Sequence, residues 1–422
     1  MKKLSLGAAL ALLVTLALAA PAAAADEAVI NEVLAILKER GIVDDARYAE
    51  LVEKNTSYET RAASLLSKIV WTGDFRARYE NFWFDEDALG NEADNRNRAR
   101  YRLRIGAAVP VNDWLTAGFR LASGELDNRS TNRTLGAGVD FDRDTIAIDE
   151  AFLQVKLPID VGSTSLVFGK QSNPFLWKNG KDYMTWDPDY SPEGLSVRWT
   201  MQPTSTLSVF GNAGYFVIDE NGDAKDPHYF ALQAGGQVQA SEKIALGGRA
   251  TWYSYHSLDS AFFVRHGLFG NVGLSENADA SIDQIELSGY ARAAFSPEWP
   301  VLLHAHFAKN LDAVSLPGEG AQDTGWGIAL EVGDAKQFAL LGVGYYSLEA
   351  DFAPAFYIDS DLTDGFTNRE GWAFYGTRQV LPNTELTLEL FVSDALDTSA
   401  LFSTSVANSE RFRLRSDVVV KF

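Results

Sequence analysis

Apolar and polar residues alternate along most of the chain, from Ser67 to its last residue. The first run places Trp71, Phe75 and Tyr79 on one face and Arg76 and Arg78 on the other. A period of two predicts β-strands with one apolar and one polar face. About sixteen such runs of about ten residues occur, the length that a tilted strand needs to cross a bilayer. They lie at 69–80, 98–109, 114–123, 147–157, 164–171, 194–201, 206–217, 229–239, 243–255, 284–295, 300–309, 324–333, 336–347, 370–380, 384–394 and 409–422.

The links between these runs alternate in length. Short links lie at 110–113, 158–163, 202–205, 240–243, 296–300, 333–336 and 381–384, and long polar links lie at 81–97, 124–145, 172–193, 257–282, 348–368 and 395–408. Short turns at one end and long loops at the other are typical of barrels in outer membranes. The predicted fold class is therefore all-β, a transmembrane antiparallel β-barrel of about 16 strands.

A soluble β-sandwich is the alternative for alternating strands. One uniformly apolar face on so many long strands disfavours it. Tryptophans also lie near strand ends, as in the aromatic girdles of membrane proteins. They are Trp71, Trp114, Trp199, Trp252, Trp326 and Trp372.

Residues 26–66 have a helical period instead. Val29, Val33 and Leu37 repeat at a spacing of four, and Gly41 is a natural helix stop before a second helix capped at 44 or 45. The sequence predicts a periplasmic helical hairpin, which could form a coiled coil, dock under the barrel, touch the cell wall or be merely a packed leader.

The first 25 residues are typical of a secretory signal peptide. Lys2 and Lys3 precede an apolar run from Leu4 to Ala20, and small residues then lead to a cleavage site before Asp26. An uncleaved membrane anchor is the less favoured alternative. The predicted organisation is thus 1–25 signal peptide, 26–66 helical segment and 67–422 barrel, exported to the outer membrane of a Gram-negative bacterium.

Composition excludes several classes of function. The chain has no cysteine, so it has no thiolate metal site, thiol nucleophile or disulfide. Its net charge of −20 argues against a nucleic-acid partner. His304 and His306 share one strand face, but without a third ligand they indicate lumen polarity rather than a metal site. No spacing compels a catalytic Ser–His pair, and the prediction is a protein that is no enzyme and has no cofactor.

The last run has an assembly signal on one face. Phe412, Val418, Val420 and Phe422 form that apolar face, and the run closes on an aromatic residue. Such a strand resembles the signal read by the barrel-assembly machinery, which is therefore an expected partner.

Arginines occupy the polar faces of neighbouring runs. Facing lipid, each would cost about 2–4 kcal/mol near the bilayer midplane, so they must line water. The alternative is that the arginines only solvate the lumen and pair with Asp74, Glu80 and Asp417, but they far outnumber these carboxylates. The arginine wall consists of Arg76, Arg78, Arg98, Arg100, Arg102, Arg104, Arg120, Arg411, Arg413 and Arg415.

Acidic residues crowd the long links, where they are expected in water on mobile loops. They could hold divalent ions against lipopolysaccharide phosphates, or, as is favoured, keep the surface solvated. Examples are Asp85, Glu86, Asp87, Glu92, Asp94, Asp351, Asp359, Asp361 and Asp364.

These features together resemble the trimeric general porins and, more closely, the "putative porin" and phosphate-selective porin group. The resemblance covers nearly the whole chain after residue 25 and rests on the helical leader, the Arg98–Arg104 run, Phe-Gly-Lys-Gln at 168–171, Ser-Pro-Glu-Gly at 191–194 and Phe422. It implies a homotrimer of water-filled diffusion channels for small hydrophilic solutes, in contact with outer-membrane lipid and lipopolysaccharide. The full lysine complement of a dedicated phosphate channel is not found, so the solute stays open.

The resemblance also implies that the third external loop, 172–193, folds into the lumen and narrows it. The charged residues expected there are Lys178, Lys181, Asp182, Asp187, Asp189 and Glu193. Because guanidinium groups stay protonated, the arginine wall predicts a mild anion preference. The alternatives are a barrel that encloses or displays a partner protein and a barrel-embedded enzyme.

Overall fold

The computed structural model describes residues 33–84, 95–124, 129–138, 141, 143–176, 179–222, 225–258, 262–263, 267–272, 281–315, 318, 320–398 and 410–422. The chain divides into two compact units, Met1–Val70 and Trp71–Phe422, which are described separately. The predicted signal peptide, 1–25, lies outside the described residues, and so do 26–32 of the predicted helical segment.

The first unit is helical where it is described. Residues 33–39 form one helix, and α3 (Asp45–Lys68) forms the second. The Asp44 carboxylate accepts a hydrogen bond of 2.7 Å from the Arg47 backbone N–H, which caps the start of α3. Gly41 adopts a φ of +69° between the two helices, a conformation that glycine reaches without strain. No helix in the described part of the chain is both long and apolar enough to cross a membrane.

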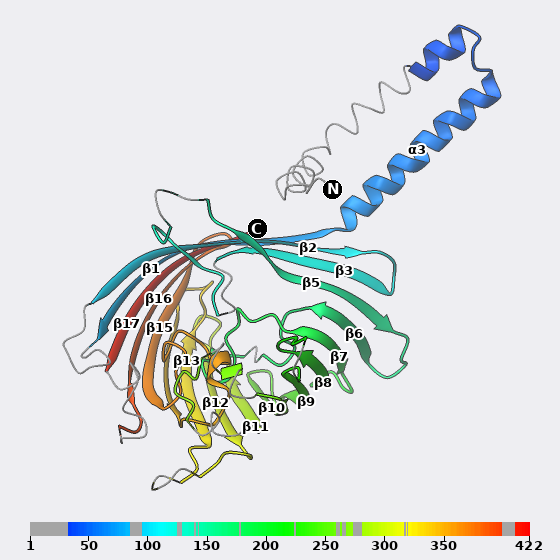
Figure 1. Cartoon of the computed structure of the whole chain (residues 1–422). Helices are drawn as coiled ribbons and strands as arrows, with labels where there is room; N and C mark the ends of the chain where they lie inside the picture. Colours follow the sequence, from blue (N-terminus) through cyan, green and yellow to red (C-terminus); the bar gives the residue numbers. More distant parts are fainter. Residues whose placement is uncertain are drawn as a thin grey trace. The chain divides into compact units, whose positions relative to one another are not determined.

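The second unit consists of long antiparallel strands (Figure 1). The strands are β1 (Val70–Phe84), β2 (Arg96–Pro110), β3 (Leu115–Ser123), β4 (Arg133–Thr134), β5 (Ile146–Leu157), β6 (Ser163–Lys170), β7 (Glu193–Met201), β8 (Leu207–Val217), β9 (His228–Gln239), β10 (Ile244–His256), β11 (Ile282–Ala293), β12 (Val301–Asn310), β13 (Thr324–Gly333), β14 (Leu340–Leu348), β15 (Arg369–Leu381), β16 (Thr384–Ala395) and β17 (Arg411–Lys421). A 3-10 turn, η2 (Ala355–Tyr357), lies in the loop before β15.

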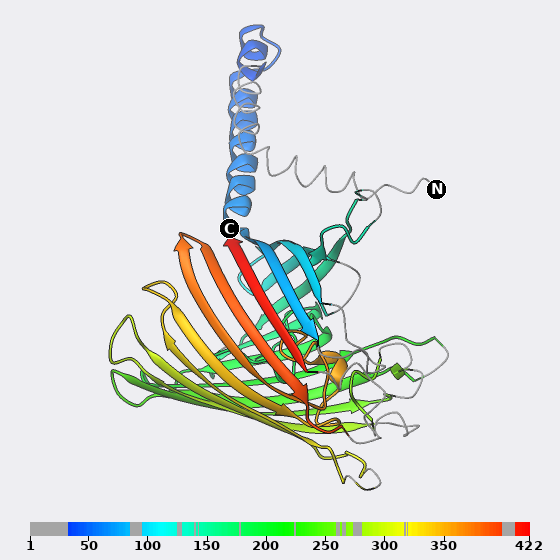
Figure 2. The same ribbon diagram turned by 90° about the vertical axis from the view of Figure 1, so that its left-hand side faces the viewer.

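The strands form one closed barrel. Each long strand pairs with its neighbours in sequence, and β17 pairs with β1 from Asp74↔Lys421 to Phe84↔Arg411. Figure 2 shows β17, in red, beside β1, in blue. Sixteen long strands therefore make the barrel, and the two-residue β4 is added beside β2. The predicted barrel and its strand number are confirmed.

Besides shifts of a few residues at strand ends, such as the extension of β1 to Phe84, two details differ from the predicted runs. The short β4 has too few residues to show an alternation, so no strand was predicted there. The run predicted from 336 starts at Leu340, because the Asp334 carboxylate accepts backbone hydrogen bonds from Lys336 (2.7 Å) and Gln337 (3.2 Å). These bonds hold the chain in a turn before β14 begins.

The two faces of the strands differ as the alternation predicts. On β13, Trp326, Ile328 and Leu330 are 42%, 45% and 39% exposed, whereas the residues between them are buried. The rings of Trp326 and Trp372 flank that of Tyr345 at centroid distances of 5.5 and 4.9 Å. An exposed aromatic group of this kind on the outer face matches a membrane-interface girdle.

A glycine allows the barrel to close at the start of β1. Gly73 and Phe422 exchange two backbone hydrogen bonds of 2.8 and 3.0 Å. The Phe422 ring covers Gly73 so closely that an added Cβ would lie 2.3 Å from it. Phe412, Val418 and Val420 are exposed on the outer face with Phe422, and their role as an assembly signal stays a prediction.

Candidate functional site

The loop between β6 and β7, residues 171–192, crosses the space enclosed by the strands. Lys181 and Tyr183 both donate hydrogen bonds to the carboxylate of Glu389 on β16, the second of them over 2.8 Å. Gly180 adopts a φ of +81° and lies against the His304 ring on β12, where an added Cβ would be 2.5 Å away. The loop therefore runs from its own strands to strands far around the barrel.

Aromatic packing holds the middle of this loop. Phe175 is fully buried and packs edge-on against Phe216 and Tyr253 of the wall, with centroids 6.1 and 5.8 Å apart. Trp186 stacks on Tyr357 at 4.3 Å. These contacts fix the path of the loop, because each aromatic pair adds stabilisation beyond that of the apolar area that it buries.

A second loop, residues 349–368, also lies inside the barrel, with η2 among the segments that the strands enclose (Figure 1). Phe352, Phe356 and Ile358 are almost completely buried. The two loops are joined by Asp187, whose carboxylate accepts hydrogen bonds from the Ser360 N–H (3.1 Å) and hydroxyl (2.9 Å). The lumen is therefore occupied by more than the crossing loop, and described residues of the 257–281 link, such as Phe262, pack against the same cluster.

This second loop corrects an expectation of the sequence analysis. Asp351 and Asp359, expected in water on a mobile external loop, are only 1% and 3% exposed. The expectation was wrong because it counted acidic residues and overlooked the apolar run from 352 to 358, which is unusual for a solvated loop. That run was the signal that could have revealed the inward path.

Carboxylates in the two loops have perturbed pKa values. Burial and the nearby Asp189 raise the pKa of Asp187 to about 6. Burial and the nearby Asp187 likewise raise the pKa of Asp359 well above its usual range. Burial alone would also raise the pKa of Asp189, but Arg76, Arg102 and other arginines hold it well below its usual range. The loops thus carry one carboxylate whose pKa is lowered beside two whose pKa values are raised by burial and by a nearby carboxylate.

The arginine wall faces inward, as its parity predicts, but carboxylates neutralise most of it. At the β1–β17 seam, Arg78 and Asp417 form a two-pronged ion pair of 2.7 and 2.8 Å. The Asp74 carboxylate forms ion pairs with Arg102 Nη2 and with Arg104 Nε, each at 2.7 Å. The remaining paired arginines are Arg98 with Glu80, Arg120 with Asp149 and Glu150, Arg411 with Asp364, Arg413 with Glu80, Asp361 and Asp364, and Arg415 with Asp361 and Glu389.

The expectation that arginines far outnumber carboxylates on the wall was therefore wrong. The additional partners come from the 349–368 loop, from the 171–192 loop and from strands whose alternation was not compared with that of the wall. Asp361 and Asp364, expected in external solvent, are two of them.

Two wall arginines have no carboxylate closer than 3.8 Å among the described residues. Arg76 donates to the Asn132 side-chain oxygen (3.0 and 2.5 Å), and within the described residues no carboxylate comes within 4 Å of it. The nearest carboxylate to Arg100 is Glu80, at 3.8 Å, which also receives Arg98 at 2.5 Å. These two positions carry the uncompensated positive charge of the wall.

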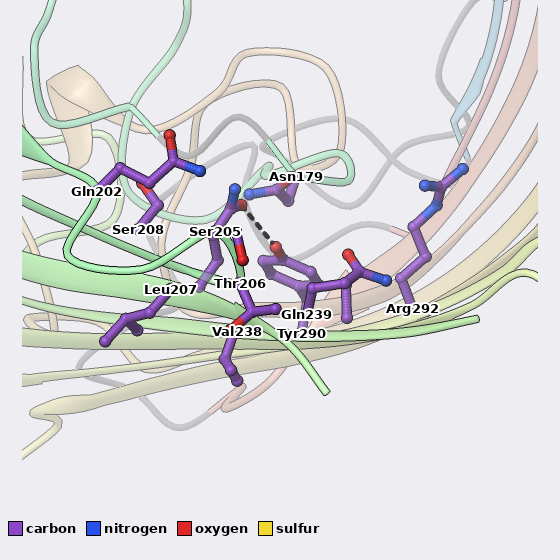
Figure 3. A pocket seen from close by; sticks show the side chains of 12 residues that line it. Asn179, Gln202, Ser205, Thr206, Leu207, Ser208, Val238, Gln239, Tyr290 and Arg292 are labelled. Atoms are coloured by element: carbon purple, nitrogen blue, oxygen red, sulfur yellow. Dashed lines mark hydrogen bonds between the residues drawn. The ribbon is translucent and has the colours of Figure 1, made fainter. Parts of the chain in front are cut away.

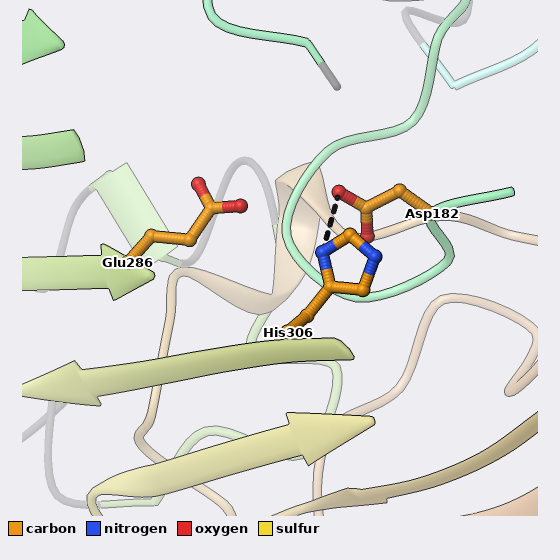
Figure 4. Close-up of side chains that lie close together, drawn as sticks. All are labelled: Asp182, Glu286 and His306. Carbon is orange, nitrogen blue, oxygen red and sulfur yellow. Dashed lines mark ion pairs between the residues drawn. The ribbon is translucent and has the colours of Figure 1, made fainter. Parts of the chain in front are cut away.

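One charged group anchors the crossing loop to the wall (Figure 4). Asp182 lies 3.6 Å from both His306 Nδ1 and Arg249 Nη2, and Glu286 accepts Arg249 Nη2 at 2.5 Å. The Asp182, Glu286 and His306 donor atoms all lie within 4.8 Å of one another, a spacing that could suit a metal ion. The Arg249 guanidinium already contacts both carboxylates, so it occupies the place where such an ion would bind.

The two remaining charged residues predicted for the loop are Lys178 and Glu193. Lys178 lies outside the described residues. Glu193, grouped with the loop by the sequence analysis, instead begins β7 and pairs with Lys170 at 2.7 Å. It has the parity of the exposed Leu195 and not that of the buried Ser196, so it faces outward and cannot line a constriction.

A pocket of about 350 Å³ lies at the short-turn end of the lumen (Figure 3). Asn179 of the crossing loop faces Tyr290 and Arg292 of β11 across it, and Tyr290 donates a 3.0 Å hydrogen bond to Gln237. Amide and hydroxyl side chains dominate its lining, and none of the described residues that line it is acidic. The lumen is therefore polar at this end as well.

Comparisons with known proteins agree with this architecture. The model of a protein family described as "putative porin" matches residues 86–262, which is less than half of the chain. The structure of OprB from Pseudomonas putida is similar at a TM-score of 0.55 and 11% identity, over 86% of this chain and 97% of that one.

Two structures with lower TM-scores match over similar shares of this chain and of their own. The outer membrane channel DcaP of Acinetobacter baumannii has a TM-score of 0.47 at 12% identity, over 84% and 97% of the two chains. A triple mutant of the Rhodopseudomonas blastica porin has a TM-score of 0.42 at 11% identity, over 84% and 100%. No sequence match to a curated protein was found.

Proposed function

We propose that this protein is an outer-membrane porin, a water-filled diffusion channel for small hydrophilic solutes. The observation that carries the proposal is the closed sixteen-stranded barrel with an exposed apolar outer face and a polar interior. Its match to a "putative porin" family and its likeness in fold to OprB support it. The partial family match supports the channel class and leaves the solute to experiment.

The 171–192 loop forms the constriction in this proposal. Its path from β6 to Glu389 on β16, with Asp182 anchored at Arg249, supports this role. Charged groups on the loop and the wall then align polar solutes, whereas apolar solutes lose hydration without compensation. The 349–368 loop narrows the same passage, because it is bonded to Asp187.

The channel prefers anions mildly. Compensated ion pairs produce little field at a distance, so Arg76 and Arg100 supply the preference. The net charge of −20 does not oppose it strongly, since fields from distant exposed carboxylates fade over a Debye length of about 8 Å.

The protein is expected to be a homotrimer inserted by the barrel-assembly machinery and in contact with lipopolysaccharide, after export by the signal peptide at 1–25. Cross-linking in mild detergent tests the trimer. A Phe422→Ser substitution that reduces barrel insertion, with unchanged export, would support the assembly signal.

Planar-bilayer recording of the purified chain with a panel of solutes tests the proposed function. Steady conductance that small sugars and salts reduce according to size is expected. A barrel that encloses or displays a partner protein gives no steady conductance, and a barrel enzyme releases products from lipid in a mass-spectrometric assay; either result would contradict the proposal.

A further inference from the structure

Arg292 of β11 borders two cavities at the short-turn end of the lumen. The first is the pocket of about 350 Å³ that Asn179 also lines, and Arg292 lies at its edge (Figure 3). The second has a volume of about 340 Å³ and is lined in addition by Leu302 of β12 and Glu331 of β13. The structure describes all of the short turns beside this second cavity, 294–300, 334–339 and 382–383. Because both cavities share Arg292, one solute can contact both.

Arg292, Leu302 and Glu331 form one row across three strands. Arg292 is the register partner of Leu302, and Leu302 is the register partner of Glu331. Arg292 has the parity of the buried Ser288, and Leu302 has that of the buried His304, so both side chains face the lumen. Glu331 is only 8% exposed and lies on the same inner face. The row therefore presents a cation, an apolar group and a carboxylate in turn.

The two charges of this row do not neutralise each other. Neighbouring strands lie about 4.8 Å apart, so about 10 Å separates the backbones of Arg292 and Glu331, with Leu302 between them. Among the described residues, neither Arg292 nor Glu331 has an ion-pair partner within 4.0 Å. Lys181 of the crossing loop interacts with Glu331 from a greater distance, because its Nζ is bound to Glu389. Both ends of the row can therefore still bind an opposite charge.

Tyr375 of β15 holds the Glu331 carboxylate in position. Its ring lies over Gly342 of β14, where an added Cβ would be 2.1 Å away. Gly342 is the register partner of both Glu331 and Tyr375, so the glycine lets the tyrosine reach the carboxylate. Tyr375 donates a 2.7 Å hydrogen bond to Glu331 Oε1. An ionised carboxylate can accept about four hydrogen bonds, so Glu331 retains the capacity to accept an ammonium group.

Three more charged residues line the second cavity, namely Asp334, Lys336 and Glu385. The Asp334 carboxylate accepts the Lys336 backbone N–H over 2.7 Å, and Glu385 forms an ion pair of 2.8 Å with Lys421. The Lys336 side chain is exposed. The lining thus carries charges of both signs, which disfavours a solute whose charges all have one sign, since it would meet like charges.

The first cavity supplies neutral hydrogen-bonding groups beside Arg292. Asn179, Gln237 and Gln239 line it together with Tyr290, whose hydroxyl donates a 3.0 Å hydrogen bond to Gln237. An amide side chain both donates and accepts hydrogen bonds, as a peptide group does. These residues therefore match a solute that carries peptide groups next to its carboxylate.

From this arrangement we infer a binding site for short zwitterionic peptides, with the peptide carboxylate at Arg292 and its ammonium group at Glu331. An extended peptide of two or three residues spans about 7–10 Å, which matches the width of the row, and an apolar side chain can pack on Leu302. The guanidinium fork of Arg292 suits a carboxylate. The inference rests on the proposed function, because such a peptide must enter the lumen to reach the site.

Titration calorimetry of the full chain in detergent with trialanine tests the site. N-acetyl-trialanine amide, which lacks both terminal charges, should bind at least about tenfold more weakly, as expected when charge-assisted contacts are lost. Arg292→Gln should weaken trialanine binding by a similar factor, and because Arg292 is exposed this variant should fold like the wild type. Glu331→Gln keeps an oxygen for the Tyr375 hydroxyl and should give a similar loss. Glycine, which is too short to span the row, should bind more weakly than trialanine.

Two matched variants make the same charge changes on the outer face. Arg378→Gln removes an exposed arginine near the short-turn end of β15. Glu370→Gln removes an outward carboxylate that accepts a 2.5 Å hydrogen bond from the Tyr345 hydroxyl. Trialanine binding should be unchanged in both. Equal binding of trialanine and the blocked peptide would overturn the site, as would equal affinities of Arg292→Gln and Arg378→Gln for trialanine.

Conductance of the same samples separates the two proposals. A wild-type chain that conducts but binds neither peptide overturns the site and leaves the porin intact. A chain that binds trialanine but does not conduct overturns the porin.

Discussion

Replacing both Arg76 and Arg100 with Gln should remove most of the anion preference of the channel. These two guanidiniums lack the close carboxylate partners that neutralise the rest of the arginine wall. Glutamine keeps a hydrogen-bonding side chain that can still reach Asn132 or Ser130, so the local structure should survive the change.

The magnitude follows from the uncompensated charge. One charge about 6 Å from a passing ion contributes roughly 0.7 kcal/mol in water, and screening over that distance about halves it. An anion then gains and a cation loses about 0.3 kcal/mol, which is roughly a threefold ratio of permeabilities for each charge. Under a tenfold KCl gradient one charge corresponds to a reversal potential of about 20 mV, and both to about 40 mV.

The assay is the reversal potential of single channels in a planar bilayer. The double variant should move it toward zero by about 40 mV, and each single variant by about half of that. The charge-neutral control replaces Arg78 with Gln and Asp417 with Asn, which removes a close ion pair from the same wall and should leave the potential within a few millivolts. If Arg76→Gln/Arg100→Gln has the wild-type reversal potential, the wall does not set selectivity and the reasoning fails.

Three further outcomes are expected. Deleting 176–188 from the crossing loop should raise single-channel conductance, and an unchanged value would place the constriction elsewhere. The pKa of Asp187 is raised to about 6 in the folded protein, so protonation of Asp187 stabilises the contact between the two loops. This contribution is complete below the unfolded pKa of about 4 and is lost as pH rises through about 6. The loops should therefore loosen, and current fluctuations should increase, between about pH 5 and pH 8. Asp187→Asn should remove that pH dependence, and a variant with the wild-type response would refute the assignment. Gly73→Val should displace the Phe422 ring and lower barrel thermal stability in detergent by about 1–3 kcal/mol, measured by the temperature of heat modification against a Gly222→Val control, a position with open space around it.

The strands, their faces and the closure of the barrel could be predicted from the sequence. Alternation is a local property: Phe75 and Arg76 point to opposite faces because successive residues of a strand must do so, whatever the rest of the chain does. For the same reason the parity of the arginine wall was correct, and the Asp44 cap and Gly41 stop marked the helices of the first unit.

The paths of the loops could not be predicted in the same way. A loop has no period, and whether the 349–368 loop extends into solvent or packs inward depends on partners such as Trp186 and Tyr190, which lie more than a hundred residues away in the chain. Glu193 was placed on the wrong face because the register of β7 against β6 decides where the loop ends.

The sequence by itself determined that arginines line the lumen, and the tertiary structure alone decided what charge they present there. The face on which a strand residue lies depends on that strand alone, because successive residues point to opposite faces. Charge compensation depends on distance, and the Coulomb interaction is strong only where partners approach within a few ångströms. Asp361 belongs to the 349–368 loop before β15, whereas Arg413 and Arg415 lie on β17. The three side chains come together only in the folded barrel.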